Sequence, residues 1–152
     1  MRRAHLISLI AAGLLVFLAI SALLARVFSV DGAERSAVTA LIEAEARGDQ
    51  NAMLARLRGC RTSAACQARV RADIATLRRP GTVAILQLQT SASFSLTSTL
   101  GAARVAWNVD SSLPIVQCVE VRRAGNALGG LRVELLAISV RLKSDAVCPS
   151  RF

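Results

Sequence analysis

The chain begins with its longest apolar run. Residues 6–25 carry no charge, and their only polar members are Ser8 and Ser21. A helix of this length rises about 1.5 Å per residue and spans roughly 30 Å, the thickness of the hydrocarbon core of a bilayer. The segment is apolar on every side, whereas a surface helix of a soluble protein keeps one polar face. The pattern therefore predicts a transmembrane helix that contacts the lipid bilayer through residues 6–25.

The charges that flank this run predict its orientation. Arg2 and Arg3 precede it, and Arg26 follows it. Positive charges at the first flank favour a cytoplasmic N-terminus, and Arg26 can extend its side chain to the membrane surface. We therefore expect a single-pass protein of the cell membrane. Residues 1–30 would form the cytoplasmic N-terminus and signal anchor, and the rest of the chain would be extracytoplasmic.

A cleaved signal peptide is the alternative for this segment. Its apolar core normally has ~7–15 residues and ends in an A-x-A-like site. The run here is longer, and Leu23 stands two positions before Ala25, so the end of the run forms no clean cleavage site. We favour the uncleaved anchor on these grounds.

From residue 31 the apolar positions recur at helical spacing. Asp31 followed by Glu34 resembles a capping box, in which Asp caps a helix and Glu stands three positions later. Gly48 would end this first helix of the domain. Its apolar positions are Val38, Leu41, Ile42 and Ala46.

Two further helices are expected before the pattern changes. Asp49 can cap a second helix over residues 50–58, and a third helix is expected over residues 63–78. This third helix would stop before Pro80 and Gly81, because both residues break helices.

Beyond residue 81 the period changes to that of strands. We expect strands at 82–90, 93–99, 103–109, 114–123 and 131–142. In the first strand Val83 and Ile85 share one face, whereas Leu86 and Leu88 share the other, and this switch suggests a β-bulge.

The order of helices and then strands predicts an α+β fold. After the N-terminal transmembrane helix, three short helices would pack on one face of a curved antiparallel sheet of four to five strands. The domain would cover residues 31–143, and residues 144–152 would form a C-terminal tail held by a disulfide.

The domain has four cysteines, Cys60, Cys66, Cys118 and Cys148, and their expected location outside the cytoplasm bears on their role. They lack histidine partners and the close spacing of zinc sites, and they lack the C-x-x-C spacing of redox pairs. An even number of cysteines outside the cytoplasm favours disulfides. We prefer Cys60–Cys66 with Cys118–Cys148 among the three pairings that four cysteines allow. In the chain-entropy model these bridges contribute about 2.4 and 3.7 kcal/mol.

Basic residues dominate the second and third predicted helices, where Asp73 is the only acid and is expected to be solvated. They can form a basic face toward anionic headgroups, or simply a solvated helix surface, because they scatter around the helix. These residues are Arg56, Arg58, Arg61, Arg69, Arg71, Arg78 and Arg79. Few aromatic residues are present for stacking, and this composition argues against nucleic acid as a partner.

The stretch "AVTALIEAEARGDQNAMLARL" (37–57) resembles the opening of nuclear-transport-factor-2-like domains. It shares their amphipathic helix, Gly-Asp break and short second helix. The chain also looks like small membrane-anchored proteins of high-GC bacteria. The resemblance implies a cone-shaped α+β domain, and the superfamily includes isomerases and cyclases. Those enzymes use an Asp or His base and often a Tyr, whereas this chain has no Tyr and its one histidine is His5.

Two residues remain candidates for a pocket, namely Trp107 and Asp110. A single Trp among strand valines is more typical of a core, and Asp110 stands at a strand end before "SS", a common turn position. We therefore expect a non-catalytic, membrane-tethered binding or assembly domain with no cofactor and no metal. Its partner would be an envelope protein or a small apolar ligand. The alternative is an isomerase- or cyclase-type enzyme with a pocket Asp.

Overall fold

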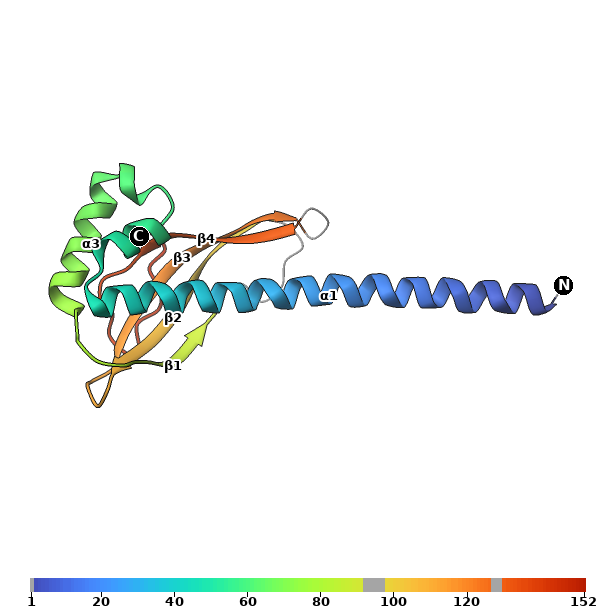
Figure 1. Ribbon diagram of the computed structural model, residues 1–152, viewed down its shortest axis with the longest axis horizontal. Helices are drawn as coiled ribbons and strands as arrows, with labels where there is room; N and C mark the ends of the chain where they lie inside the picture. The colour runs from blue at the N-terminus through green and yellow to red at the C-terminus, as the bar shows by residue number, and fades with distance from the viewer. Residues whose placement is uncertain (1, 92–97, 127–129) are drawn as a thin grey trace.

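The computed structural model describes residues 2–91, 98–126 and 130–152 and has an α+β architecture (Figure 1). A long helix leads into further short helices, and an antiparallel sheet follows that does not close into a barrel. Most of the predicted strand 93–99 lies outside the described residues. The elements are α1 (Arg2–Arg47), α2 (Gln50–Arg56), the 3-10 helix η1 (Cys60–Thr62), α3 (Ala64–Leu77), β1 (Val83–Gln89), β2 (Thr99–Val109), β3 (Ile115–Asn126) and β4 (Gly130–Ile138).

The apolar N-terminal segment and the first helix of the domain are one continuous helix, α1. The capping box expected at Asp31 and Glu34 is therefore wrong, and the boundary expected at residue 30 falls inside α1. Both carboxylates bind Arg123 of β3, 89 and 92 residues away in the sequence, instead of capping a helix start. The helix can continue because neither side chain competes for its backbone N–H groups.

The surface of α1 changes character along its length. Large side chains in its first part are exposed, for example Leu9 at 72% and Phe17 at 66%. In the domain, Val38, Leu41 and Ile42 are completely buried. One stretch of α1 is long and apolar enough to cross a membrane. The same helix thus leaves an apolar surface exposed at one end and fills the core of the domain at the other (Figure 1).

The short helices begin and end at residues whose side chains or backbones suit those positions. The Asp49 carboxylate accepts the Ala52 N–H at 2.9 Å and caps α2, as expected. The Ser63 hydroxyl accepts the Cys66 N–H and caps α3. Gly48 ends α1 in the left-handed region, with φ of 73°. Both short helices are slightly shorter than the sequence predicted.

The described sheet has four strands in the order β1-β2-β3-β4, each antiparallel to its neighbours. A register shift between Ile85 and Gln87 confirms the bulge expected in β1. Leu86 is the extra residue and is exposed, whereas Leu88 packs against the core like Val83 and Ile85. The expectation that Leu86 and Leu88 share a face is therefore wrong, because a bulge returns the following residue to the original face.

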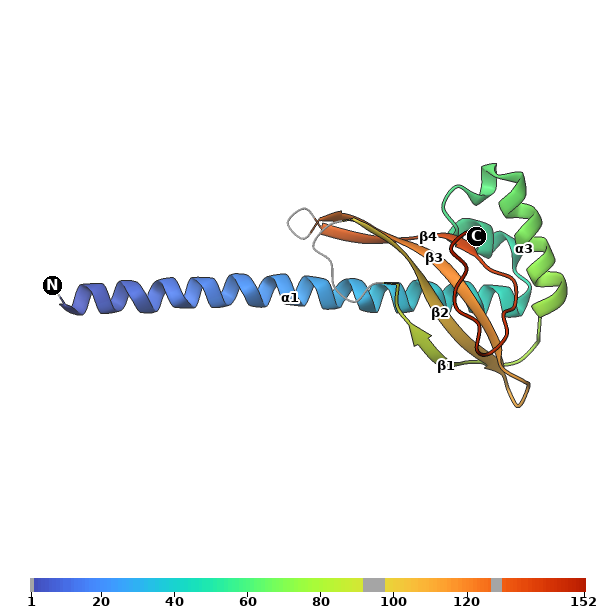
Figure 2. The ribbon, with the colours of Figure 1, turned by 180° about the vertical axis from the view of Figure 1, so that it is seen from behind.

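The sheet is covered on both faces. The domain part of α1 lies on one face, and the C-terminal tail crosses the opposite face (Figures 1 and 2). Leu142 of this tail forms a bridge with Val116 of β3. The core lies between α1 and the sheet, and its largest fully buried side chains include Trp107, Leu41 and Ile42.

Candidate functional site

A chain of buried polar groups crosses the core between the sheet and α1. The Trp107 indole N–H donates to Gln117 Oε1 at 2.8 Å. Gln117 Nε2 in turn donates to Glu45 Oε1 at 2.9 Å and to the Ser139 carbonyl at 3.2 Å. Trp107, Gln117 and Glu45 are each completely buried. The arrangement aligns a carboxyl group on α1 with an amide on β3 and an indole on β2.

A second buried carboxyl group, that of Asp73 on α3, belongs to the same region. Burial raises the pKa of Glu45 to about 8; the Gln117 hydrogen bond opposes this rise and the Asp73 charge adds to it. Burial likewise raises the pKa of Asp73 to about 7, against the attraction of Arg69. Glu45 Oε2 and Asp73 Oδ2 have no hydrogen-bond partner among the described residues. At neutral pH Glu45 is therefore largely protonated.

This pair can hold a proton, but no substrate reaches it in the described structure. Glu45 is 0% exposed and Asp73 is 1% exposed. Strongly perturbed carboxyl groups are common in active sites, which normally also have a cleft that admits the substrate. The cluster thus has the electrostatics of a general acid without the access that catalysis needs.

Neither buried carboxyl group was expected from the sequence, and the expectation that Asp73 is solvated is wrong. A signal was available in the spacing of the apolar positions. Glu45 follows Val38 by seven residues, and Asp73 follows Val70 by three, so each lies on the buried face of its helix. Charged residues are seldom buried, so neither was expected in the core, although their spacing from Val38 and Val70 indicated a buried position.

The structure does not bring the two expected pocket residues into one environment. Trp107 is completely buried in the core. Asp110 is exposed in the turn after β2, with φ of 49°, and its Oδ1 accepts the Thr82 N–H at 3.4 Å. Asp110 therefore links the turn between β2 and β3 to Thr82, the residue before β1.

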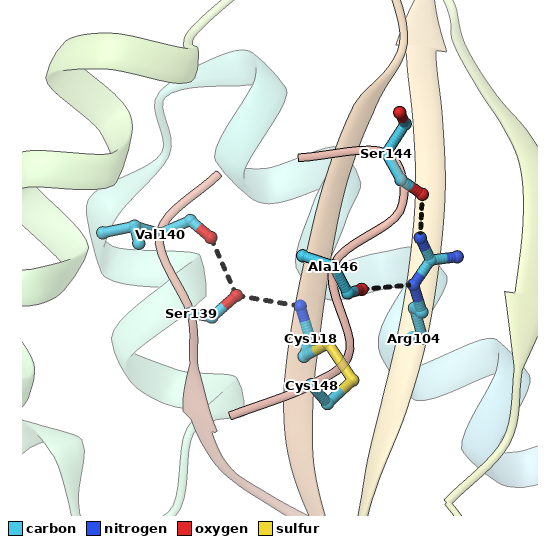
Figure 3. The surroundings of a disulfide bond; sticks show 7 residues. All are labelled: Arg104, Cys118, Ser139, Val140, Ser144, Ala146 and Cys148. Carbon is cyan, nitrogen blue, oxygen red and sulfur yellow. Dashed lines mark hydrogen bonds between the residues drawn. A yellow bond between two sulfur atoms is a disulfide. The ribbon is translucent and has the colours of Figure 1, made fainter. Parts of the chain in front are cut away.

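The cysteines pair as the sequence predicted. Cys60 and Cys66 join η1 to α3, and their Cα atoms lie 5.2 Å apart. Cys118 of β3 joins Cys148 of the tail, with Cα atoms 5.7 Å apart. Figure 3 shows the tail beside this bridge, where the Arg104 guanidinium donates to the Ser144 and Ala146 carbonyls. The disulfide and Arg104 together hold the tail against the sheet.

The arginines of the expected basic face do not act as one surface. Arg58 pairs with Glu134. Arg79 is half-buried, and its backbone N–H donates to the Ala46 carbonyl. The other five side chains are exposed: Arg56, Arg61, Arg69, Arg71 and Arg78. The helices that carry them lie at the far end of the domain from the N-terminus of α1 (Figure 1). These helices are therefore far from the exposed apolar part of α1.

A cavity of about 300 Å³ opens at this far end, between the start of α3 and β4. Its apolar lining includes Leu136, Ile138 and Phe152, and Arg69 stands at its edge.

Comparisons with protein-family models, with curated proteins and with solved structures returned no match. The cavity and the buried carboxyl groups are therefore the features from which a function can be proposed.

Proposed function

We propose that this chain is a single-pass membrane protein whose α+β domain is extracytoplasmic and binds a partner without catalysing a reaction. One observation carries the proposal: α1 exposes an apolar surface in its first part and enters the core of the domain without a break. An exposed apolar surface of this size favours lipid over water. The helix would thus hold the domain directly at the membrane.

The disulfides support the extracytoplasmic placement. All four cysteines are bridged, and such bridges persist in oxidising compartments. Together with Arg2 and Arg3 before the apolar run, they favour a cytoplasmic N-terminus.

The filled interior supports binding over catalysis. Trp107 and Gln117 occupy the space between the sheet and α1, and Glu45 is sealed behind them. The cavity beside Phe152 instead lies between the start of α3 and β4, where an envelope protein or a small apolar ligand can reach it. Pockets with an apolar lining and one charged group at the edge are typical of binding sites.

A nuclear-transport-factor-2-like domain is the fold family that we propose. The Gly-Asp break that suggested it lies where α1 ends and α2 begins, with Asp49 as the cap. Helices followed by a twisted antiparallel sheet are compatible with this family (Figure 2).

A second candidate function, that of an isomerase- or cyclase-type enzyme, draws support from Glu45. Its pKa is raised to about 8 in the core, a value suited to an acid or base at neutral pH. The pocket Asp of this alternative would be replaced by a Glu, and Asp110 would have no role. Catalysis would require an opening of the core between α1 and β3.

Two measurements test the leading proposal. Fusions of a periplasmic reporter after residue 48 should be active, and fusions of a cytoplasmic reporter there should be inactive. Photo-crosslinkers at Leu136 or Phe152 should capture a discrete partner in native membranes, whereas a matched crosslinker at the exposed Leu86 should not. A cytoplasmic domain, or equal capture from both places, would contradict the proposal.

A further inference from the structure

Contacts between β3 and α1 fix how far the sheet extends toward the N-terminus of α1. Gln117 of β3 binds Glu45, and Arg123 of β3 binds Glu34 and Asp31. Six residues along β3 thus correspond to 11 residues along α1. This ratio agrees with rises of about 3.3 Å per strand residue and 1.5 Å per helix residue. β3 therefore advances toward the N-terminus of α1 and crosses the helix at an oblique angle, as Figure 1 shows.

The same ratio places the end of β3 at the membrane surface. β3 continues three residues beyond Arg123, to Asn126, which pairs with Gly130 of β4. Arg123 lies level with Asp31 and Glu34 of α1. Three strand residues correspond to about five or six helix residues, so Asn126 lies level with about residues 25–29 of α1. The apolar run ends at Ala25, and headgroups add about 5–7 Å on each side of the hydrocarbon core. The described end of the sheet is thus level with the headgroup layer.

A cluster of charges on β3 and β4 has Arg132 as the member nearest the membrane. Arg58, Arg122 and Arg132 share a single carboxylate, that of Glu134. The Arg132 side chain is 77% exposed and that of Arg122 is 41% exposed, whereas that of Glu134 is 9% exposed. Arg132 lies closest to the end of the sheet, and Glu134 stands behind it. Exposed guanidinium groups with their carboxylate partner behind them can donate hydrogen bonds to a phosphate group.

An apolar side chain accompanies these arginines. Leu100 of β2 pairs with Arg122 across the strands and is 62% exposed. Arg123 faces the opposite way and is buried against α1, where it already has two carboxylate partners. The outward face near this end of the sheet therefore carries two partly free guanidinium groups and an exposed leucine. Arg132 lies nearest the membrane, whereas Arg122 and Leu100 are level with about residues 33–36 of α1.

We propose that Arg132 and Arg122, which lie near this end of the sheet, extend their side chains onto the headgroups of the membrane that α1 crosses and bind anionic phospholipid. The proposal rests on the proposed function, because it requires α1 to span the bilayer. The sheet lies to one side of α1, so a tilt of the helix toward that side brings both side chains closer to the headgroups. Tilts of about 20° are ordinary for membrane-spanning helices, and anchoring side chains select their direction. The bound lipid would thus fix the orientation of the domain.

Spin labels on the full-length chain in vesicles test this placement. A label at Ser98, which is exposed and precedes β2, reports on the sheet end. Labels at Phe17 of α1 and at Ala75 of α3 report on the membrane span and on the far end. The readout is the collision rate of each label with a water-soluble nickel chelate. Vesicles contain phosphatidylcholine alone or with phosphatidylglycerol.

We expect the Ser98 label to be protected from the chelate when phosphatidylglycerol is present, while the Ala75 label is accessible in both vesicles. The double variant Arg122→Gln/Arg132→Gln should lose this protection, since each arginine near an anionic surface changes the bound-to-free ratio about five-fold. The matched control Arg61→Gln/Arg71→Gln, at the far end, should retain it.

The labels separate the two ways in which the idea can fail. A Ser98 label that is equally accessible in both vesicles, with the Phe17 label still inside the hydrocarbon, overturns the lipid contact and leaves the proposed function standing. Protection that survives in the Arg122→Gln/Arg132→Gln variant also overturns it. A Phe17 label that collides freely with the chelate overturns both proposals.

Discussion

Arg123 and Glu34 form a buried ion pair between β3 and α1, with the guanidinium 2.8 Å from Glu34 Oε2. The Arg123 side chain is 3% exposed and that of Glu34 is 0% exposed. The Glu34 carboxylate also accepts the Ser91 N–H and hydroxyl, and Arg123 reaches Asp31 as well. This pair joins the sheet to α1, and it sets the register on which the proposed lipid contact depends.

Removal of one partner of this pair should be far more harmful than removal of both. Arg123→Met leaves the Glu34 carboxylate buried without its countercharge, and we expect a loss of about 3–5 kcal/mol in the free energy of unfolding. The double variant Arg123→Met/Glu34→Leu should recover much of this loss. Urea unfolding of the full-length protein in detergent checks both. Arg47→Ala, which removes an exposed pair with Glu43, is the control and should change little.

The buried Glu45 predicts that stability falls as pH rises. Its folded pKa of about 8 lies above the ordinary value of 4.5, so the folded state favours the protonated form. Its contribution is complete below pH 4.5 and is lost as pH rises toward 8, by an amount on the order of a few kcal/mol. Asp73, with a pKa raised to about 7, acts in the same direction. Unfolding curves between pH 5 and 8 should therefore show a decline in the wild-type chain.

Glu45→Gln should flatten this decline and make the protein more stable at pH 8, because a neutral amide replaces a group that must ionise in the core. Asp31 provides the internal control. Burial raises its pKa, but hydrogen bonds from Thr90, Arg123 and Arg35 outweigh this and hold the pKa below 3.8. Its stabilising effect is lost only in strong acid, outside the tested window. An unchanged slope in Glu45→Gln would contradict the assignment.

The bridge between Cys118 and Cys148 should protect the tail from proteases. In the chain-entropy model, loss of the Cys118–Cys148 bridge lowers the free energy of unfolding by about 3.7 kcal/mol in Cys118→Ser/Cys148→Ser. The corresponding loss in Cys60→Ser/Cys66→Ser is about 2.4 kcal/mol. Only the first variant should expose the tail, where trypsin can cut after Arg141 and Lys143. Limited proteolysis followed by mass spectrometry distinguishes them. Equal cleavage of the tail in both variants would contradict the prediction, because the Cys118–Cys148 bridge is intact in the second variant.

Two glycines should respond in opposite ways to alanine. Gly32 lies inside α1, and no atom lies within 4 Å of the position that an alanine Cβ would take, so Gly32→Ala should stabilise the helix by roughly 0.5–1 kcal/mol. Gly48 has φ of 73°, and a Cβ there would lie 2.7 Å from Cδ of Arg78. Gly48→Ala should therefore destabilise the junction of α1 and α2. If α1 is continuous through residue 32, the melting temperature should rise in Gly32→Ala and fall in Gly48→Ala, as measured by thermal unfolding.

Local patterns predicted the parts of the fold that depend on near neighbours. The spacing of apolar residues located the short helices and most of the strands, and Asp49 marked the start of α2. The bulge in β1 was visible as a change of face between Ile85 and Leu86. Cysteine spacing and the expected compartment were enough to favour the two disulfides. In each case the cause is steric or covalent and acts within a short span or at a few marked positions.

Only the tertiary structure decided the environments of the charged residues. Asp31 and Glu34 stand where a capping box would be, yet their partner is Arg123 on a distant strand. α1 therefore continues through them and joins the apolar segment to the domain. Glu45 is buried because Gln117 lies opposite it, 72 residues further along the chain. A carboxyl group can be solvated, paired or neutral, and the difference depends on groups that folding brings near it.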